Sequence, residues 1–252
     1  MKLLCDRSLL TLVSPITFAG ISPFIHDKSI KSTYDTFDIV QPTVYISDLS
    51  NITKGVLNCI SERPDIKVAF IKNENSDQIL ENLDKIKSCF GNAYPILENL
   101  YYYDTIACKN AKKKYSSTDL LIINSEDEKQ ANLNLPLKYI VRIFNNKNVI
   151  RSNYFCGTIS DSQIEHMYKS SKITLVNNQS RLNAIHCDSY PAELLDYEYL
   201  KHLLESDLTE EISNLKNETK DMTNFNAVIK ILKSLNEFEC ADIVCNKAKE
   251  LE

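Results

Sequence analysis

Short apolar runs rich in β-branched residues recur along most of the chain. Such runs are typical of strands that are buried on both faces of a sheet, since polar residues do not alternate with apolar ones. We expect an N-terminal strand or hairpin over Lys2–Leu4 and Leu9–Val13, followed by a loop rich in serine and proline. Five further strands are predicted at Thr43–Ser47, Lys67–Ile71, Leu120–Asn124, Tyr139–Phe144 and Ile173–Val176.

Between these runs lie segments whose apolar residues recur at helical spacing. The predicted helices are Asn51–Ser61, Ser76–Cys89, Ser160–Ser170 and Asn224–Leu235. Ser76 is an expected N-cap, and Ser160 with Gln163 has the spacing of a capping box. From about Tyr190 onwards the chain is predicted to be helical throughout.

The alternation of strands and helices indicates an α/β fold with mostly parallel sheets. A crossover helix between parallel strands covers one face of the sheet, which favours this order of elements. The polar, aperiodic segment Ser125–Leu135 predicts a hinge between two α/β units. We expect an N-terminal α/β domain over residues 1–130 and a smaller α/β domain with C-terminal helices over residues 131–252.

Composition excludes several classes of nucleotide-binding protein. The chain has 252 residues, of which 43% are hydrophobic and 25% charged, so it can bury one or two cores. Its four glycines, at positions 20, 55, 91 and 157, permit neither a G-x-G-x-x-G fingerprint nor a Walker A loop. The formal net charge of -5 means that a polyanionic partner needs a local basic patch.

The eight cysteines include no C-x-x-C pair, so zinc-ribbon spacing is missing and no metal site is predicted. Scattered cysteines are typical of small buried side chains in a reducing compartment. Pro15, Gly20 and Pro23 interrupt the uncharged run Ser8–Ile25, which disfavours a signal peptide or a membrane span. We expect a soluble cytoplasmic protein without a membrane partner. The chain is rich in Asn, Lys, Ile and Ser, a composition common in proteins encoded by AT-rich genomes, including those of many phages. A phage-encoded protein would lie in the host cytoplasm.

Two stretches of the sequence resemble a known enzyme class. Tyr154–Val176 contains Gly157 at a strand end, a short helix through His166 and Tyr168, and then an apolar strand. This order is similar to a stretch in the C-terminal domain of GT-B glycosyltransferases. Phe37–Ser47 resembles the Asp-x-x-x-x-Pro-apolar strand entry of spore-maturation-type and phage DNA sugar transferases. The resemblance implies a compact GT-B-like fold of two Rossmann-like units, with a nucleotide sugar such as a UDP-sugar as donor and no further cofactor.

The resemblance also implies a donor site in the second unit. Glu193 corresponds to a glutamate that holds the ribose hydroxyls of the nucleotide; its alternative role is a carboxylate at a helix N-terminus, stabilised by the helix dipole. Four basic residues are expected either to neutralise the diphosphate or to be solvated surface cations: Arg142, Lys147, Arg151 and Arg181. His186 lies in the same segment and is expected to contact a phosphate or the sugar.

Candidate acceptor-side groups for the transfer lie near the N-terminus. His26 and Asp27 follow the Ser14–Ile25 loop, where enzymes of this class present groups to the acceptor. A neutral imidazole is suited to taking a proton from a hydroxyl near pH 7. His26 and Asp27 are therefore the candidate catalytic residues, and Ser14 is a candidate acceptor contact. A loop histidine is also commonly just exposed to solvent.

The segment Leu100–Ser117 combines three adjacent tyrosines with four lysines. Aromatic rings beside lysines can stack on bases and hold phosphates, as in proteins that bind single-stranded nucleic acid. Tyr102, Lys112 and Lys113 are the candidate DNA contacts in this segment. An amphipathic helix with a wet lysine face explains the same pattern.

These features favour a metal-independent, nucleotide-sugar-dependent glycosyltransferase, since no D-x-D motif is present. Hydroxymethylated bases of phage DNA are the favoured acceptor, while a glycan or a protein acceptor stays open. The alternative is a non-catalytic, degenerate relative that binds a nucleotide or a partner without turnover. The scarcity of glycine and the irregular segment between Arg181 and Glu193 favour that alternative.

Overall fold

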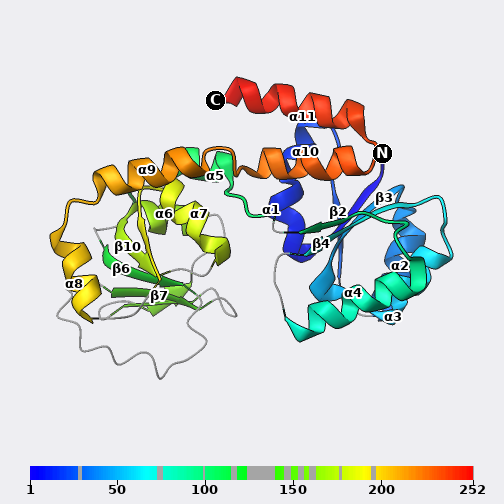
Figure 1. Cartoon of the computed structure of the whole chain (residues 1–252), viewed down its shortest axis with the longest axis horizontal. Coiled ribbons are helices and arrows are strands. Elements are labelled where there is room, and N and C mark those ends of the chain that lie inside the picture. Colours follow the sequence, from blue (N-terminus) through cyan, green and yellow to red (C-terminus); the bar gives the residue numbers. More distant parts are fainter. Residues whose placement is uncertain are drawn as a thin grey trace. The chain divides into compact units, whose positions relative to one another are not determined.

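The computed structural model describes residues 1–27, 30–72, 76–98, 100–114, 118–123, 140–144, 149–152, 156–158, 163–175, 178–193 and 197–251. The chain forms two α/β units (Figure 1). The first unit comprises Met1–Tyr101 and Thr223–Glu252, and the second comprises Tyr102–Met222. The chain therefore leaves the first unit once and returns to it for its last two helices.

The first unit is built on a parallel five-stranded sheet in the order β2-β1-β3-β4-β5. Its first strand is flanked on both sides, since Leu4 pairs with Phe24 of β2 and with Tyr45 of β3. The strand order therefore reverses between β1 and β3, which makes that gap the switch point of this sheet. The strands are β1 (Leu3–Asp6), β2 (Phe24–His26), β3 (Val44–Asp48), β4 (Lys67–Lys72) and β5 (Ile96–Glu98).

Three amphipathic helices cover one face of this sheet: α2 (Ile30–Val40), α3 (Lys54–Ser61) and α4 (Asp77–Phe90). Ser76 caps α4 as expected, because its side chain accepts a hydrogen bond from the backbone N–H of Ile79. The helices and the sheet share one apolar core, to which the strands contribute Leu4, Tyr45, Val68 and Phe70 and the helices Phe37, Val56, Ile60, Ile79 and Leu83.

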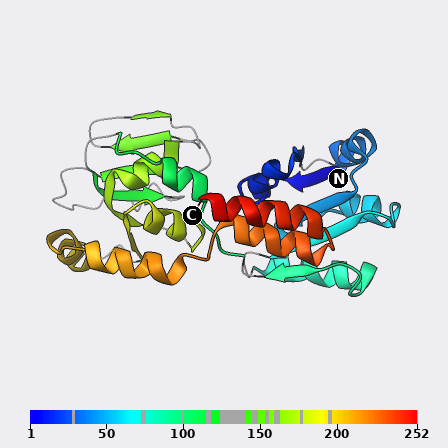
Figure 2. The same cartoon turned by 90° about the horizontal axis from the view of Figure 1, so that it is seen from above.

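The opposite face explains why the C-terminal helices belong to the first unit. Alternate strand residues such as Leu3, Val44 and Ile46 are fully buried there. The local helix α1 (Leu10–Val13) has only four residues, which is too short to cover a sheet face. α10 (Asn224–Ser234) contacts α1 and buries most of its apolar residues, and α11 (Phe238–Leu251) packs beside α10 (Figure 2).

The second unit contains a six-stranded sheet in the order β11-β10-β6-β7-β8-β9. The first four strands of this order are parallel, and β8 and β9 continue the sheet as antiparallel strands. The strands are β6 (Thr118–Ile123), β7 (Ile140–Phe144), β8 (Val149–Ser152), β9 (Cys156–Thr158), β10 (Ser171–Leu175) and β11 (Tyr190–Ala192).

Helices pack on both faces of this second sheet. α5 (Thr105–Asn110), α6 (Ile164–Lys169) and α7 (Asn178–His186) share a core with Leu121 of β6. α8 (Tyr197–Glu205) and the start of α9 (Thr209–Thr219) share another core with Leu120 of the same strand. Leu120 and Leu121 point to opposite faces because side chains alternate along a strand. The α/β class predicted from the sequence is confirmed.

The five internal strands predicted by apolar runs are present, but several other expectations are wrong. Leu9–Val13 is helical, and the serine- and proline-rich segment after it is a 3-10 helix, Ser14–Ala19, rather than a loop. The chain is not helical throughout from Tyr190, because Tyr190–Ala192 forms the edge strand β11. Pro191 is compatible with that strand because an edge position leaves one side of the backbone unpaired. Ser160 of the expected capping box lies outside the described residues.

The division between the units also differs from the expected one. It falls between Tyr101 and Tyr102 instead of at residues 130/131, and the second unit ends at Met222 instead of at the C-terminus. The expected hinge Ser125–Leu135 lies outside the described residues. The physical reason is that α10 and α11, from the far end of the sequence, pack on α1 and on the 3-10 helix Ser14–Ala19 of the first unit.

Candidate functional site

Arg181 and Glu193 lie together at the carboxyl edge of the second sheet. Arg181 is near the start of α7, which follows β10, and Glu193 comes directly after β11. β10 and β11 are parallel neighbours, so their carboxyl ends meet at the same edge. In open α/β sheets this is the edge at which ligands bind. The structure thus brings together two residues that the sequence analysis assigned to one site.

An ion pair joins the two side chains, with Arg181 Nη1 donating to Glu193 Oε1. The side chains are 36% and 69% exposed, so the pair stabilises the fold by at most about 1 kcal/mol. A guanidinium has five N–H donors and a carboxylate about four acceptor positions. One shared hydrogen bond therefore leaves both groups able to bind a ligand, in positions that the pair already holds.

Two tyrosines that the sequence analysis missed lie next to this pair. The hydroxyls of Tyr199, on α8, and Tyr190, on β11, are hydrogen-bonded to each other. Partial burial raises the pKa of Tyr199; the Tyr190 hydroxyl and Glu193 raise it further, while Arg181 opposes the shift. Tyr199 therefore shares the electrostatic environment of the ion pair. No sequence motif signals this proximity, because it depends on the packing of α8 on the sheet.

Glu193 comes directly after the edge strand β11. The chain from Tyr190 to Ala192 pairs with Ile173–Leu175 as a strand, and the next described helix begins only at Tyr197. Residues 194–196, between Glu193 and that helix, lie outside the described residues. The exposed carboxylate of Glu193 at a strand end suits a ligand contact.

His186 lies at the end of α7 in a partly buried setting. Its ring stacks on Tyr103 with centroids 3.5 Å apart, and its Nε2 is 3.0 Å from Thr219 Oγ1. Partial burial, followed by the Lys216 ammonium, lowers the pKa of His186 to about 4 from its ordinary 6.5. The ring is therefore neutral at pH 7 and its contacts hold α7 against α9, at the opposite end of α7 from Arg181.

The other expected diphosphate ligands are not brought to this edge by described contacts. Arg142 lies within β7, where its backbone is paired opposite Ile122 of β6 and Arg151 of β8. Lys147 lies outside the described residues. Among the basic residues expected at the donor site, Arg181 alone has a described side chain at the carboxyl edge.

In the first unit, His26 belongs to a buried polar network at the carboxyl ends of β1, β2 and β3. The expected loop position is wrong, because His26 is the last residue of β2 and is 2% exposed. Its Nδ1 lies 2.8 Å from Asp6 Oδ1, and its Nε2 lies 2.9 Å from Thr33 Oγ1. Both ring nitrogens therefore have protein partners. Asp27 follows as an exposed residue at the end of the strand.

Asp6, at the end of β1, is the centre of this network, and its carboxylate is hydrogen-bonded to groups of the two flanking strands, β2 and β3. Tyr45 Oη donates to Oδ1 at 2.7 Å, while Ser47 Oγ and the backbone N–H of Asp48 donate to Oδ2 at 3.0 and 2.8 Å. Burial, followed by the Asp6 charge, raises the pKa of Tyr45 well above 10, which keeps its phenol protonated as a donor. A carboxylate that is only 1% exposed is thus fully provided with donors.

The expected acceptor contacts are dispersed. Ser14 donates to the Thr11 carbonyl and receives a hydrogen bond from Asn224 of α10, so it joins two helices of the first unit. Tyr102 is buried, whereas the Lys112 and Lys113 side chains are exposed. These lysines do not form the face of a long amphipathic helix, because α5 ends at Asn110.

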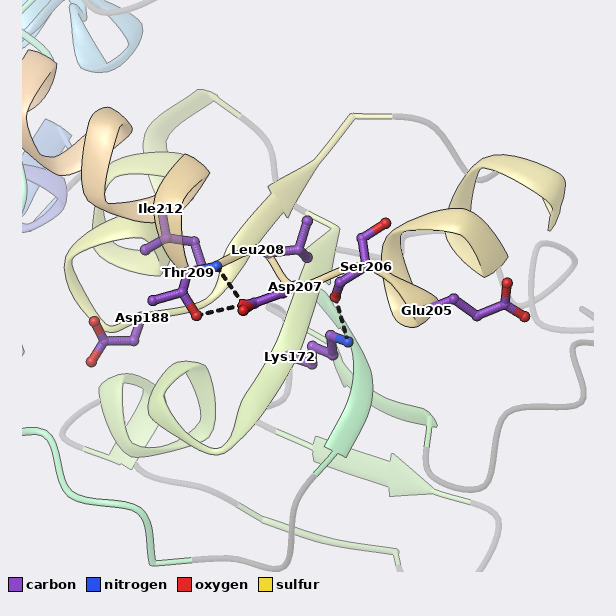
Figure 3. A pocket seen from close by; sticks show the side chains of 8 residues that line it. All are labelled: Lys172, Asp188, Glu205, Ser206, Asp207, Leu208, Thr209 and Ile212. Atoms are coloured by element: carbon purple, nitrogen blue, oxygen red, sulfur yellow. Dashed lines mark hydrogen bonds between the residues drawn. The ribbon is translucent and has the colours of Figure 1, made fainter.

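A pocket of about 480 Å³ lies at the other end of the second sheet (Figure 3). It is near the amino ends of β10 and β11, away from Arg181 and Glu193. Lys172 donates to the backbone carbonyl of Ser206 there, and Asp207 accepts from the backbone N–H and the hydroxyl of Thr209. These contacts hold the connection between α8 and α9. The lining residues are Lys172, Asp188, Glu205, Ser206, Asp207, Leu208, Thr209 and Ile212.

The chain matches none of the protein-family models, curated proteins or solved structures with which it was compared. Within the described parts of the chain, His, Cys, Asp and Glu side chains form no group of three or more that could hold a metal ion. None of the helices in those parts combines the length and the apolar character that crossing a bilayer requires.

Replacing Tyr45 by Phe tests the Asp6 network. The variant removes one donor to a buried carboxylate, so we expect the free energy of unfolding to fall by about 1.5–3 kcal/mol. Tyr34→Phe is the matched control, because the Tyr34 hydroxyl takes part in an exposed hydrogen bond with Asn58; its loss should stay within about 0.5 kcal/mol. Urea unfolding measures both, and equal losses in the two variants would contradict the central role of Asp6.

The lowered pKa of His186 predicts a pH dependence of stability. The unfolded chain binds a proton at this residue below pH 6.5, whereas the folded chain does so only near pH 4. Protonation therefore favours unfolding, and stability should fall as the pH decreases from 6.5 to 4. His186→Gln should lose this contribution, while His202→Gln, at an exposed position of α8, should keep it. Urea unfolding at several pH values compares the three proteins, and identical slopes would exclude the shift.

Proposed function

We propose that the protein is a metal-independent glycosyltransferase that takes a nucleotide sugar as donor. The observation that carries the proposal is the Arg181–Glu193 pair at the carboxyl ends of two adjacent parallel strands. The resemblance of Tyr154–Val176 to GT-B enzymes supports it, as does the presence of adjacent parallel strands in the sheet of each unit. The two units would be the two Rossmann-like halves of a compact GT-B arrangement.

Each residue of the pair has a defined task in this proposal. The Arg181 guanidinium donates to the diphosphate, where planar bidentate contacts are favourable, and Glu193 accepts from the two ribose hydroxyls. During transfer the bond between the anomeric carbon and the diphosphate oxygen breaks, and negative charge grows on the leaving diphosphate. Arg181 stabilises that charge, so its contribution is larger in the transition state than in the bound donor.

The acceptor hydroxyl needs a base, and the fold favours Asp27 over His26. His26 is buried with both ring nitrogens engaged, while Asp27 is exposed at the carboxyl end of β2. Asp27 would take the proton of the acceptor hydroxyl as its oxygen bonds to the anomeric carbon. His26 would act through the Asp6 network by fixing the end of the strand that carries Asp27.

For the acceptor, we propose a hydroxymethylated base of phage DNA. The exposed lysines of the second unit, Lys109, Lys112, Lys113 and Lys114, supply a local basic segment in a chain of net charge -5. Phosphates of a nucleic acid bind such segments even when the whole protein is acidic. A base must also leave the duplex before a sugar can be attached to it.

The second candidate is a non-catalytic relative that binds a nucleotide without turnover. Arg181 and Glu193 neutralise each other, and an exposed pair of this kind also occurs in proteins as a plain surface contact. The two candidates differ in whether sugar is transferred, since the second binds a nucleotide or a partner without turnover.

Calorimetry with UDP- and GDP-sugars tests the donor site. We expect one nucleotide sugar to bind, and Arg181→Gln or Glu193→Gln to weaken it by about 10- to 100-fold, because each removes a hydrogen bond worth about 1.5–3 kcal/mol. Glu250→Gln is the matched control, since the Lys247–Glu250 pair has a similar exposure, 36% and 65%, in the other unit. Lack of binding, or equal weakening of binding in all three variants, would contradict the proposed donor site.

Transfer of labelled sugar tests the acceptor. The protein would be incubated with the donor and with plain, hydroxymethylated and single-stranded DNA, and we expect label only on the hydroxymethylated DNA. The double variant Lys112→Gln and Lys113→Gln should raise the KM for DNA and flatten its salt dependence, because fewer counterions are released. Label on protein or glycan alone would exclude DNA, and binding without any transfer would favour the non-catalytic relative.

A further inference from the structure

Two cysteines from distant parts of the sequence meet in the core of the second unit. Cys108 lies on α5, and Cys187 directly follows α7. Both belong to one cluster of buried residues, in which Cys108 is 9% exposed and Cys187 is fully buried. The cluster also contains Leu121 of β6 and Tyr168 of α6, so it lies under the helices on one face of the sheet.

The two cysteines converge on a single residue, Asn183. The backbone N–H of Cys187 donates to the Asn183 carbonyl at 3.0 Å, as part of the last turn of α7. The Cys108 thiol lies 3.9 Å from the same carbonyl oxygen and 3.8 Å from Asn183 Oδ1. The side chains of Cys108 and Cys187 are also hydrogen-bonded to each other. The two side chains are therefore neighbours in this core.

We propose that Cys108 and Cys187 are a dithiol that closes to a disulfide under oxidising conditions and clamps α5 to α7. A low-molecular-weight disulfide such as oxidised glutathione is the oxidant. One protein thiolate attacks it, forming a mixed disulfide and releasing the first glutathione thiolate. The second protein thiolate then attacks the cysteine sulfur of that mixed disulfide and releases the second glutathione. Two thiols lose their protons and two electrons, and one oxidised glutathione becomes two reduced molecules.

In this proposal, opening of α5 gives the oxidant access to the pair. The hydrogen bond with Cys187, followed by burial, raises the pKa of the Cys108 thiol, so little reactive thiolate is present while the core is closed. α5 has six residues and is held to α7 by a hydrogen bond from the Asp104 backbone to Asn183 and by the stacking of Tyr103 on His186. Detachment of this short segment exposes both thiols, and oxidation then fixes the segment in place.

The proposed disulfide would fix the start of the second unit. α5 begins three residues after Tyr102, where the second unit starts. A bond between Cys108 and Cys187 encloses most of the second sheet in one covalent loop, and long loops gain the most from closure. The oxidised unit should therefore unfold at a higher temperature. This inference does not depend on the proposed transferase activity.

Treatment of the full chain with oxidised glutathione, followed by digestion and mass spectrometry without reduction, tests the proposal. We expect a peptide in which Cys108 is linked to Cys187, a mass loss of two hydrogen atoms at that pair, and a rise of roughly 5–10 °C in Tm. Low concentrations of urea should speed the reaction, since they favour opening. The exposed Cys89 of α4 should instead take up glutathione without urea.

Variants assign the effect to this pair. Cys108→Ser and Cys187→Ser should each abolish both the link and the rise in Tm, while Cys89→Ser should keep them. If a serine variant does not fold, Cys108→Ala is used, and the digest of the unaltered protein decides in any case. The proposal is overturned if Cys108 and Cys187 stay reduced, or carry one glutathione each, under conditions that open α5.

Discussion

The first unit depends on the hydrogen bonds of one buried carboxylate, that of Asp6 at the end of the first strand. Asp6 is buried, and a buried charge is tolerated only when donors replace the water it has lost. Those donors come from the strands on either side, His26 on β2 and Tyr45, Ser47 and the Asp48 backbone on β3. The network therefore fixes the carboxyl ends of three strands at the switch point of the sheet. It also defines the position of Asp27, which continues from His26.

The strands were predictable because their burial on both faces leaves uninterrupted apolar runs, as at Lys67–Ile71 and Leu120–Asn124. α2 was not predicted, since Phe37–Val40 was assigned to a strand entry although it forms the end of that helix. The positive φ of Gln41 and the following Pro42 end the helix before β3. The unit boundary depends on the long-range packing of α10 and α11 on α1 and on the 3-10 helix Ser14–Ala19, which no local pattern expresses.

At the candidate site, too, the sequence indicated residue types but not the contacts between residues that are distant along the chain. Arg181 and Glu193 were named from a resemblance and lie in contact, because β10 and β11 are neighbours in the sheet. His26 was assigned to a loop, and its contact with Asp6 was missed. Asp6 lies 20 positions earlier, and nothing in the spacing shows that the two side chains meet. Tyr199 and the Cys108–Cys187 contact were missed for the same reason. Residue types indicate possible chemistry, but only strand order brings them together.

Hydrogen–deuterium exchange with and without the nucleotide sugar tests the central claim, that the carboxyl edge of the second sheet holds the donor. Backbone amides at the start of a helix and at a strand end exchange more slowly when a ligand occupies that edge. We expect protection of peptides covering residues 178–193, strongest at the start of α7. Unchanged exchange across residues 178–193, with protection elsewhere in the chain, would contradict it.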